Sequence, residues 1–383
     1  MSQALPYWRL SGFYFLYFGL LGALLPYWPL YLRELGHDAL AIGLLLAIVH
    51  GTRIPAPSLW SWLATRTGQR TRVIRLGSLL AALVFAGVLV DQRLAWLALV
   101  MAGFSFFWNA VLAQFEVLTL SHLPGQAERY SAIRVWGSVG FIAAVAGLGW
   151  LFGQQSVRWL PLVMLGLLAA LWLCTLSVAE RPRPTRARPS GSLRERLARP
   201  EVWSFLGACA LLQVSHGPYY AFLSIYLEQQ GHGSTAIGLL WALGVVAEVL
   251  VFIAMPSLLR WLSLRSLMLV SLGLAVVRWL MIGLWADQLI VLIVAQSLHA
   301  ATFGSYHAYA VEAVRRLFSG GHEGQGMALY SGLSFGGGGA IGALAAGLGW
   351  GVGPSLVFVG AAGVAALALW LGWWGSRPAR WSH

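Results

Sequence analysis

The chain has 383 residues, of which 58% are hydrophobic and only 10% are charged, and its formal net charge is +12. A soluble chain carries about 25% charged residues, so this composition excludes a globule whose solvent is water. All 25 basic residues are arginines, and the absence of lysine excludes a Walker A motor and any enzyme that uses a lysine Schiff base.

About twelve apolar stretches are long enough to cross ~30 Å of hydrocarbon as helices. Alternating ten-residue strands, which a membrane β-barrel requires, are absent from the sequence. We therefore expect an all-α integral membrane protein with twelve transmembrane helices. The predicted spans are 8–32, 40–63, 73–91, 94–120, 130–152, 158–179, 201–228, 235–258, 265–285, 288–314, 324–349 and 353–374.

A repeated segment indicates how these helices are grouped. Residues 31–45 read YLRELGHDALAIGLL and residues 226–240 read YLEQQGHGSTAIGLL, with 9 of 15 positions identical. Two related halves in an apolar chain are typical of transporters whose substrate binds between the halves. We expect six-helix bundles at 1–180 and 201–383, joined by a cytoplasmic Arg- and Pro-rich linker at 181–200.

The arginines are distributed unequally between the two sides of the expected membrane. By the predicted loops, 19 lie on the side of both termini and three lie opposite, at Arg33, Arg93 and Arg158. Positive charge favours the cytoplasmic side. The sequence thus predicts a multi-pass protein of the bacterial inner (plasma) membrane with both termini in the cytoplasm, and explains the net charge without a nucleic-acid partner.

Charged groups near the bilayer centre cost at least ~2.5–3.5 kcal/mol, so each one needs a partner or a function. In the first half these are Arg53, Glu116 and Arg134. Glu116 and Arg134 flank one short loop, so a hairpin places them at similar depth, either as a structural ion pair or as a substrate site. Tyr14 and Tyr17 share a helix face and are candidates for stacking on a substrate ring or for core packing.

The helix at 201–228 contains a polar group of residues interrupted by a proline. Gln213, His216 and Tyr220 are candidate substrate contacts, and Pro218 is expected to distort the helix beside them. For each aromatic residue the alternative is packing in the core.

Glu248 and Arg278 lie on neighbouring helices of the second half and form the candidate pair that matches Glu116 and Arg134. Movement of Arg278 toward or away from the carboxyl would load or release a proton, and His299 can take part because imidazole titrates near neutral pH. His307 follows eight residues later on roughly the same face, either as a coupling residue or as a hydrogen-bonded structural histidine. Static pairing of Glu248 and Arg278 is the alternative to coupling.

Four segments resemble those of major facilitator superfamily transporters, and more closely the phenylpropionate permease family, related to lactose permease-like and nucleoside–proton symporters. They are RVWGSVG (134–140), LLQVSHGPYY (211–220), LLWALGVVAEV (239–249) and QSLHAATFGSYH (296–307). The loop SWLATRTGQR also resembles the superfamily's G-x-L-A-D-R-x-G-R pattern, but Thr65 replaces its acidic residue. The resemblance implies the major facilitator fold, with Arg53 facing a cavity, Glu116 and Arg134 contacting substrate, and Glu248, Arg278 and His299 coupling.

From these features we expect a proton-coupled symporter that works by alternating access and takes up a small organic solute, most readily an aromatic carboxylate such as a phenylpropionate-like acid. The alternatives are a sugar or nucleoside symporter and a drug/proton antiporter. The sequence has no HExxH or Gly-x-Ser-x-Gly motif, which argues against a membrane enzyme. The partners expected are the solute, protons and the lipid bilayer, with no cofactor or metal and with function as a monomer.

Overall fold

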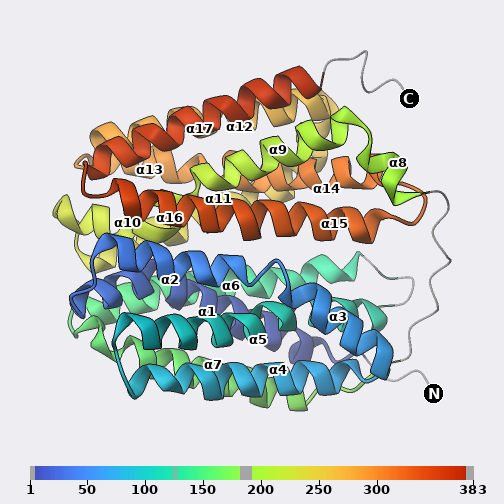
Figure 1. The fold of residues 1–383 in the computed structure, drawn as a ribbon, viewed down its shortest axis with the longest axis horizontal. Coiled ribbons are helices and arrows are strands. Elements are labelled where there is room, and N and C mark those ends of the chain that lie inside the picture. Colours follow the sequence, from blue (N-terminus) through green and yellow to red (C-terminus); the bar gives the residue numbers. More distant parts are fainter. Residues whose placement is uncertain (1–4, 124–125, 127, 182–191, 377–383) are drawn as a thin grey trace. The chain divides into compact units, whose positions relative to one another are not determined.

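The computed structural model describes residues 5–123, 126, 128–181 and 192–376. Within these ranges the ordered elements are all helical (Figure 1). The chain divides into two compact units: unit 1 comprises Met1–Thr185 and Gly233–Ala242, and unit 2 comprises Arg186–His232 and Leu243–His383. The first turns of the helix Ser234–Trp261 therefore group with unit 1, where Gly238 lies so close to Val145 and Tyr27 that a Cβ would clash with both.

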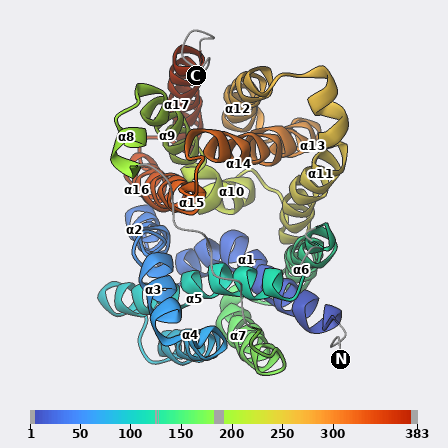
Figure 2. The same cartoon turned by 90° about the vertical axis from the view of Figure 1, so that its right-hand side faces the viewer.

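Unit 1 is a bundle in which α1 packs against α6 and α7, and α5 packs against α2, α3 and α4 (Figure 2). Its helices are α1 (Tyr7–Glu34), α2 (Ala39–Gly51), α3 (Ala56–Thr67), α4 (Arg70–Phe85), η1 (Ala86–Leu89), α5 (Leu94–Ser121), α6 (Arg129–Phe152), η2 (Val157–Trp159) and α7 (Leu160–Leu176).

Unit 2 is a second bundle, in which α17 packs against α9 and α12. Its first elements are α8 (Leu193–Leu197), α9 (Pro200–Ser215), α10 (Gly217–Gln229), α11 (Ser234–Trp261) and α12 (Leu264–Trp285). The remainder are α13 (Leu289–Ser297), η3 (Ala300–Ser305), α14 (Tyr306–Leu317), α15 (Glu323–Ser331), η4 (Gly332–Gly338), α16 (Gly339–Gly349) and α17 (Pro354–Gly375).

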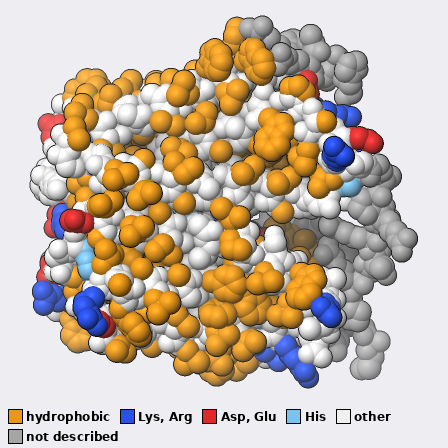
Figure 3. All heavy atoms as spheres, in the orientation of Figure 1, with side chains coloured by type: hydrophobic (Ala, Val, Ile, Leu, Met, Phe, Trp, Pro, Cys, Tyr) orange, Lys and Arg blue, Asp and Glu red, His pale blue; other side chains and the backbone are white. Residues whose placement is uncertain are grey.

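Eleven helices of the described residues are long and apolar enough to cross a membrane. The twelfth expected span, at 201–228, is divided into α9 and α10, each of which is too short to be counted alone. Large apolar side chains such as Ile253, 73% exposed, lie on the outside. On the face drawn in Figure 3, hydrophobic side chains cover the length of the helices and charged ones gather near their ends. The expected twelve-helix membrane fold is confirmed.

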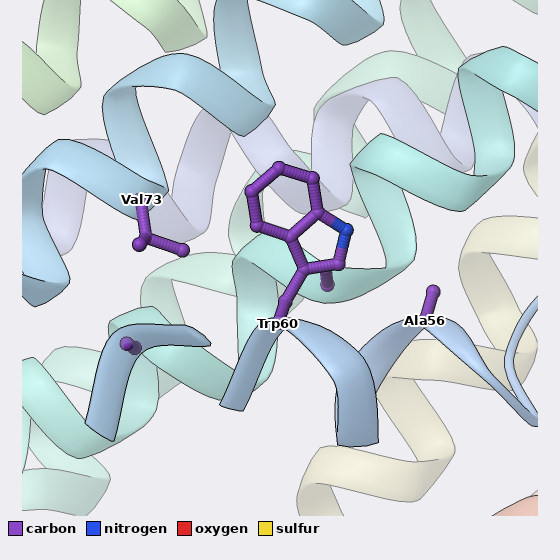
Figure 4. Packing of buried hydrophobic residues seen from close by; sticks show 5 residues of the cluster. Ala56, Trp60 and Val73 are labelled. Atoms are coloured by element: carbon purple, nitrogen blue, oxygen red, sulfur yellow. The ribbon is translucent and has the colours of Figure 1, made fainter. Parts of the chain in front are cut away.

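The predicted span at 40–63 contains a break that determines the position of Arg53. Residues 52–55 form turns between α2 and α3, because Pro55 lacks the backbone N–H of a continuous helix. After the break, small residues on α3 let it pack closely, so that Trp60 lies between α4 and α5 with Ala56, Ala64, Val73 and Ala110 (Figure 4). The break thus places Arg53 on a short connection between two firmly packed helices.

The division between α9 and α10 also has a local cause. Pro218 at the start of α10 removes a backbone donor, and Gly217 lies against Gly342 of α16, where a Cβ would clash with the Gly342 backbone. Gly338 approaches the carbonyl oxygen of Ala210 in the same way. Gly338 and Gly342 of the glycine run at 335–351 therefore serve close helix packing within unit 2.

Two of the predicted spans contain π-helical segments, η3 in the helix at 289–317 and η4 in the helix at 323–349. A π-turn carries an extra residue and often lies at a functional site. Both segments are in unit 2, next to the polar residues singled out from the sequence.

The end of α7 is tied to α4 by two reciprocal contacts. One oxygen of Glu180 accepts hydrogen bonds from the backbone N–H and hydroxyl of Thr71, at 2.6 and 2.7 Å. Arg75 donates to the carbonyls of Thr175, Leu176 and Val178. Thr65, which replaces the superfamily's acid, instead donates to the carbonyl of Ser61. Of the expected linker at 181–200, residues 182–191 lie outside the described residues, and the remainder contains α8.

Candidate substrate and coupling sites

Arg53 belongs to a polar group between α2 and α5. Its Nε lies 3.3 Å from Oδ1 of Asn109, and the Asn109 amide donates to the Val49 carbonyl and to the Thr52 hydroxyl. Thr52 in turn donates to Ser105, at 2.9 Å. The Val49 carbonyl, which the helix break leaves without its usual partner, is thus satisfied by Asn109, and Arg53 is half-buried.

Glu116 of α5 and Arg134 of α6 form an ion pair, with Nε 3.9 Å from Oε1. Their side chains are 38% and 31% exposed, so the pair is long and accessible. The guanidinium lies over the ring of Phe18, 4.0 Å from its centroid. Gly137 makes this arrangement possible, because a Cβ there would lie 2.8 Å from both Arg134 and Phe18. The expected pairing is present, and the substrate role assigned to it stays a prediction.

The two tyrosines of α1 have different surroundings. Tyr14 donates to the hydroxyl of Thr119, at 3.1 Å, and its ring lies 5.5 Å from the guanidinium of Arg134. Tyr17 stacks on Trp108 with centroids 4.8 Å apart and is 3% exposed. Tyr14 therefore borders the Glu116–Arg134 pair, whereas Tyr17 belongs to the aromatic packing behind it.

Asn109 and Gln114, both on α5, were not among the residues predicted from the sequence. Asn109 organises the group around Arg53, and Gln114 is 2% exposed with an Oε1 that has no hydrogen-bond partner among the described residues. Both amides interrupt an otherwise apolar span, FSFFWNAVLAQF. Amides in membrane helices usually bond across helices, and this signal could have identified them.

Arg278 is fully buried on α12. Its three donor nitrogens bind the Ala295 carbonyl, the Gln296 side chain and the Thr302 hydroxyl, all at 3.0–3.1 Å. Its guanidinium also lies 4.3 Å from the ring of Tyr219 and 4.6 Å from that of Trp279. These partners are uncharged, so a buried positive charge is held by hydrogen bonds and ring faces.

Glu248 pairs with a different residue from the one expected. Its Oε2 lies 3.9 Å from Nε2 of His299, with side chains 18% and 6% exposed, and the described residues contain no ion pair between Glu248 and Arg278. The expected Glu248–Arg278 pair is wrong as a contact, because Arg278 turns toward α13 and η3. Gly304 of η3 makes room for Glu248, since a Cβ there would lie 3.0 Å from Glu248 Cγ.

His299 and His307 lie at the two ends of a column of parallel rings. Phe303 stacks on His299 at 5.3 Å and on His307 at 6.2 Å. In a regular α-helix, residues four apart drift by about 40°; the wider π-turn of η3 reduces this drift and aligns the rings. His307 Nδ1 lies 3.1 Å from the hydroxyl of Tyr330, so this histidine is tied to α15.

The polar residues of α9 and α10 are buried against α12 and the helices after it. His216 Nδ1 contacts the Leu212 carbonyl at 2.8 Å, and its Nε2 has no hydrogen-bond partner among the described residues. Its ring packs on Trp279 and Tyr220, at 4.8 and 5.8 Å. Gln213 is 4% exposed and lies beside Gly338. These residues line the region of Arg278 and His299, and their contact with substrate stays a prediction.

Within the residues that the structure describes, no group of three His, Cys, Asp or Glu side chains could hold a metal ion. The side chains present at these sites can form ion pairs, hydrogen bonds and ring stacks, and the carboxyl and imidazole groups can exchange protons.

Comparison with known proteins identifies the family and the fold of this chain. A family model described as "MFS_1 like family" matches residues 7–359. A probable 3-phenylpropionic acid transporter of Escherichia coli (strain K12) is 34% identical over 354 residues, covering 89% of this chain and 90% of the relative. The maltose permease of Geobacillus stearothermophilus is 28% identical, covering 70% and 68%.

Solved structures support the fold alone. A mutant of the nucleoside transporter NupG superposes with a TM-score of 0.87 at 16% identity, covering 97% of this chain and all of that one. A bacterial homologue of the human lysosomal transporter Spinster superposes with a TM-score of 0.77 at 15% identity, covering 97% and 96%. Given the family match over most of its length, the chain belongs to the MFS_1-like family of the major facilitator superfamily and is a membrane transporter, not an enzyme.

Proposed function

We propose that this transporter takes up an aromatic carboxylate of the 3-phenylpropionate type together with protons. The observation that carries the proposal is the arrangement around Arg134. Its guanidinium lies over the Phe18 ring, while its ion pair with Glu116 is 3.9 Å long and both side chains are more than 30% exposed. A carboxylate ligand can replace one partner of such a pair through charge-assisted hydrogen bonds.

The aromatic part of the substrate has suitable surroundings at the same place. Phe18 and Tyr14 both lie beside the guanidinium, and aromatic rings favour offset or edge-to-face packing on one another. Arg53, the other arginine of unit 1 that the sequence places well inside a predicted span, is held by Asn109 and adds positive potential. The relative with the highest identity among those named, at 34%, is a probable transporter of such an acid, which supports this substrate class.

Proton coupling is assigned to the Glu248–His299 pair, with Arg278 beside it. The two side chains lie 3.9 Å apart and are shielded from solvent, so a proton held there exchanges with water only when the protein changes conformation. The buried charge of Arg278 makes an added positive charge on the pair costly. Binding of an anionic substrate and of a proton would then favour each other, which is the requirement for symport.

We further propose that residues 1–180 and 201–383 are the two halves that rock about the site in alternating access. Residues 181–200 are assigned as the connecting linker. The excess of arginines in the loops on the side of the termini supports cytoplasmic termini in a bacterial inner membrane.

The test is uptake of labelled 3-phenylpropionate into proteoliposomes that contain the purified protein. We expect accumulation above the external concentration when the outside is acidic, loss of accumulation with a protonophore, and no effect of replacing Na⁺ by choline. Competition by phenylpropanol, maltose and nucleosides measures the contribution of the carboxylate, and we expect all three to be poor competitors.

Two results would overturn the proposal. If phenylpropanol competes as well as the acid, the carboxylate is not recognised. If maltose or a nucleoside is accumulated and 3-phenylpropionate is not, the substrate class is wrong.

A further inference from the structure

A cavity of about 350 Å³ lies in unit 2 between the end of α11, the start of α12 and α14. Its walls are largely apolar and include Met255, Leu259, Leu267 and Ala308. At one side it is bordered by Glu312 and Arg316 of α14. It shares no residue with the polar groups around Arg278 and His299, so the proposed transport sites leave it without a function.

The charged side of the cavity carries a surplus of positive charge. Both oxygens of Glu312 are occupied, because Arg315 donates to them at 2.7 and 2.8 Å and Arg316 Nε donates at 2.7 Å. Arg315 and Arg316 are 69% and 55% exposed. The terminal nitrogens of Arg316 donate no hydrogen bond to another described residue, and a guanidinium fork of this kind matches the oxygens of a phosphate.

The position of the cavity along the helices fits the edge of a bilayer. Trp261, at the end of α11, is 87% exposed and follows the exposed Arg260. Tryptophan and arginine at the end of an apolar span mark the level of lipid headgroups. The cavity therefore opens where a headgroup phosphate and the first part of an acyl chain meet.

We propose that this cavity binds an anionic phospholipid. The lipid phosphate lies on Arg316, with Arg315 adding charge, and an acyl chain lies against Met255, Leu259 and Ala308. Two arginines against one carboxylate select a net negative headgroup over a zwitterionic one, since basic residues near a membrane surface attract anionic lipid. The site needs only that this end of unit 2 reaches the membrane surface, and it is independent of the substrate proposed above.

Native mass spectrometry of the full-length protein, titrated with phosphatidylglycerol or phosphatidylcholine, tests the site. We expect at least one phosphatidylglycerol to bind about tenfold more tightly than phosphatidylcholine, because both lipids carry the phosphate but the choline group adds a positive charge that the two arginines repel. Arg316→Gln should remove this preference. Ala308→Phe should fill the cavity and weaken binding while both arginines are kept.

The matched control is Arg72→Gln in unit 1, since Arg72 is also an exposed arginine that donates to a side chain close to it in the sequence, Gln69. This variant should leave the ratio of phosphatidylglycerol to phosphatidylcholine affinity within about twofold of the unmodified protein's, because it removes no contact of the proposed site. Equal binding of the two lipids, or equal loss in Arg316→Gln and Arg72→Gln, would overturn the proposal. So would release of the bound lipid by glycerol phosphate at equal concentration, which would show that a free phosphate ester suffices.

If Arg316→Gln is not monodisperse, Ala308→Phe decides, and unchanged phosphatidylglycerol binding in that variant contradicts the site. A loss of lipid binding with normal substrate uptake, or the reverse, separates this proposal from the proposed transport function.

Discussion

The two units hold their membrane-buried arginines in opposite ways. Arg134 in unit 1 is about one-third exposed, shares a long ion pair with Glu116 and lies on a ring. Arg278 in unit 2 is inaccessible, and each of its donor groups is bound to an uncharged acceptor. A loosely paired and accessible cation can change partners at little cost, whereas a fully bonded buried one cannot. We infer that unit 1 exchanges a ligand at its arginine and that unit 2 uses its arginine as a fixed charge.

The largest effect is expected at Glu248. Glu248→Gln removes the carboxyl of the proposed proton site with His299, so uphill accumulation driven by a proton gradient should be lost. Exchange of labelled for unlabelled substrate should persist, because that reaction needs no net proton movement. Both are measured in proteoliposomes, with Glu195→Gln on the exposed α8 as the control. If Glu248→Gln still accumulates substrate against its gradient, the proton is coupled through another residue.

Next in size is the loss of the accessible cation. Arg134→Gln removes a charge-assisted hydrogen bond of ~1.5–3 kcal/mol, so binding of the acid should weaken by roughly 10- to 100-fold. The affinity is read from concentration-dependent exchange. Arg129→Gln, on the same helix and exposed, should bind normally. Similar losses in both variants would show that any loss of positive charge from α6 weakens binding, and that the pairing of Arg134 with Glu116 is not the cause.

A third variant tests the fixed arginine through stability. Arg278→Lys keeps the charge but loses the planar fork, leaving one or two acceptors unpaired at ~1–3 kcal/mol each. We expect the Tm of the purified protein to fall by at least ~5 °C. Arg134→Lys, where water can replace the lost bonds, should change the Tm by less than about 2 °C. Equal falls in Tm for Arg278→Lys and Arg134→Lys would contradict the difference proposed between the two arginines.

The smallest effect is expected at the end of the ring column. Tyr330→Phe removes the hydroxyl that contacts His307, and a single hydrogen bond contributes about 1 kcal/mol. The Tm should fall by ~2–4 °C while the proton dependence of uptake is unchanged. A changed proton dependence would instead make His307 part of the coupling pathway.

The sequence was most informative where one residue type or one short loop determines the outcome. Hydropathy alone predicted the helices, and Pro218 predicted the interruption beside His216. Glu116 and Arg134 could be paired because a short hairpin leaves them little freedom. The segment SWLATRTGQR also showed that Thr65 replaces the superfamily's acidic residue. It did not show that Glu180 accepts hydrogen bonds from Thr71.

Partners across longer connections could not be predicted in this way. Whether Arg278 meets Glu248 depends on the rotation of α12 about its own axis, which neighbouring helices determine through packing. The role of Asn109 depends on the break between α2 and α3, which leaves the Val49 carbonyl free to accept its hydrogen bond. Every residue has a backbone carbonyl, so the sequence does not show which one needs a partner. Such contacts are properties of the assembled bundle.

The wide turn at Ala300–Ser305 has a consequence for how this protein tolerates changes in length. This segment holds one residue more than a regular α-helical turn without ending the helix. Deleting a single residue from it is therefore expected to leave a regular α-helix in which His307 still faces Tyr330, whereas deleting one from the regular helix Leu289–Ser297 would rotate every later side chain of that span by about 100°. A one-residue shortening is thus expected to damage the protein less within the wide turn than in the α-helical part before it.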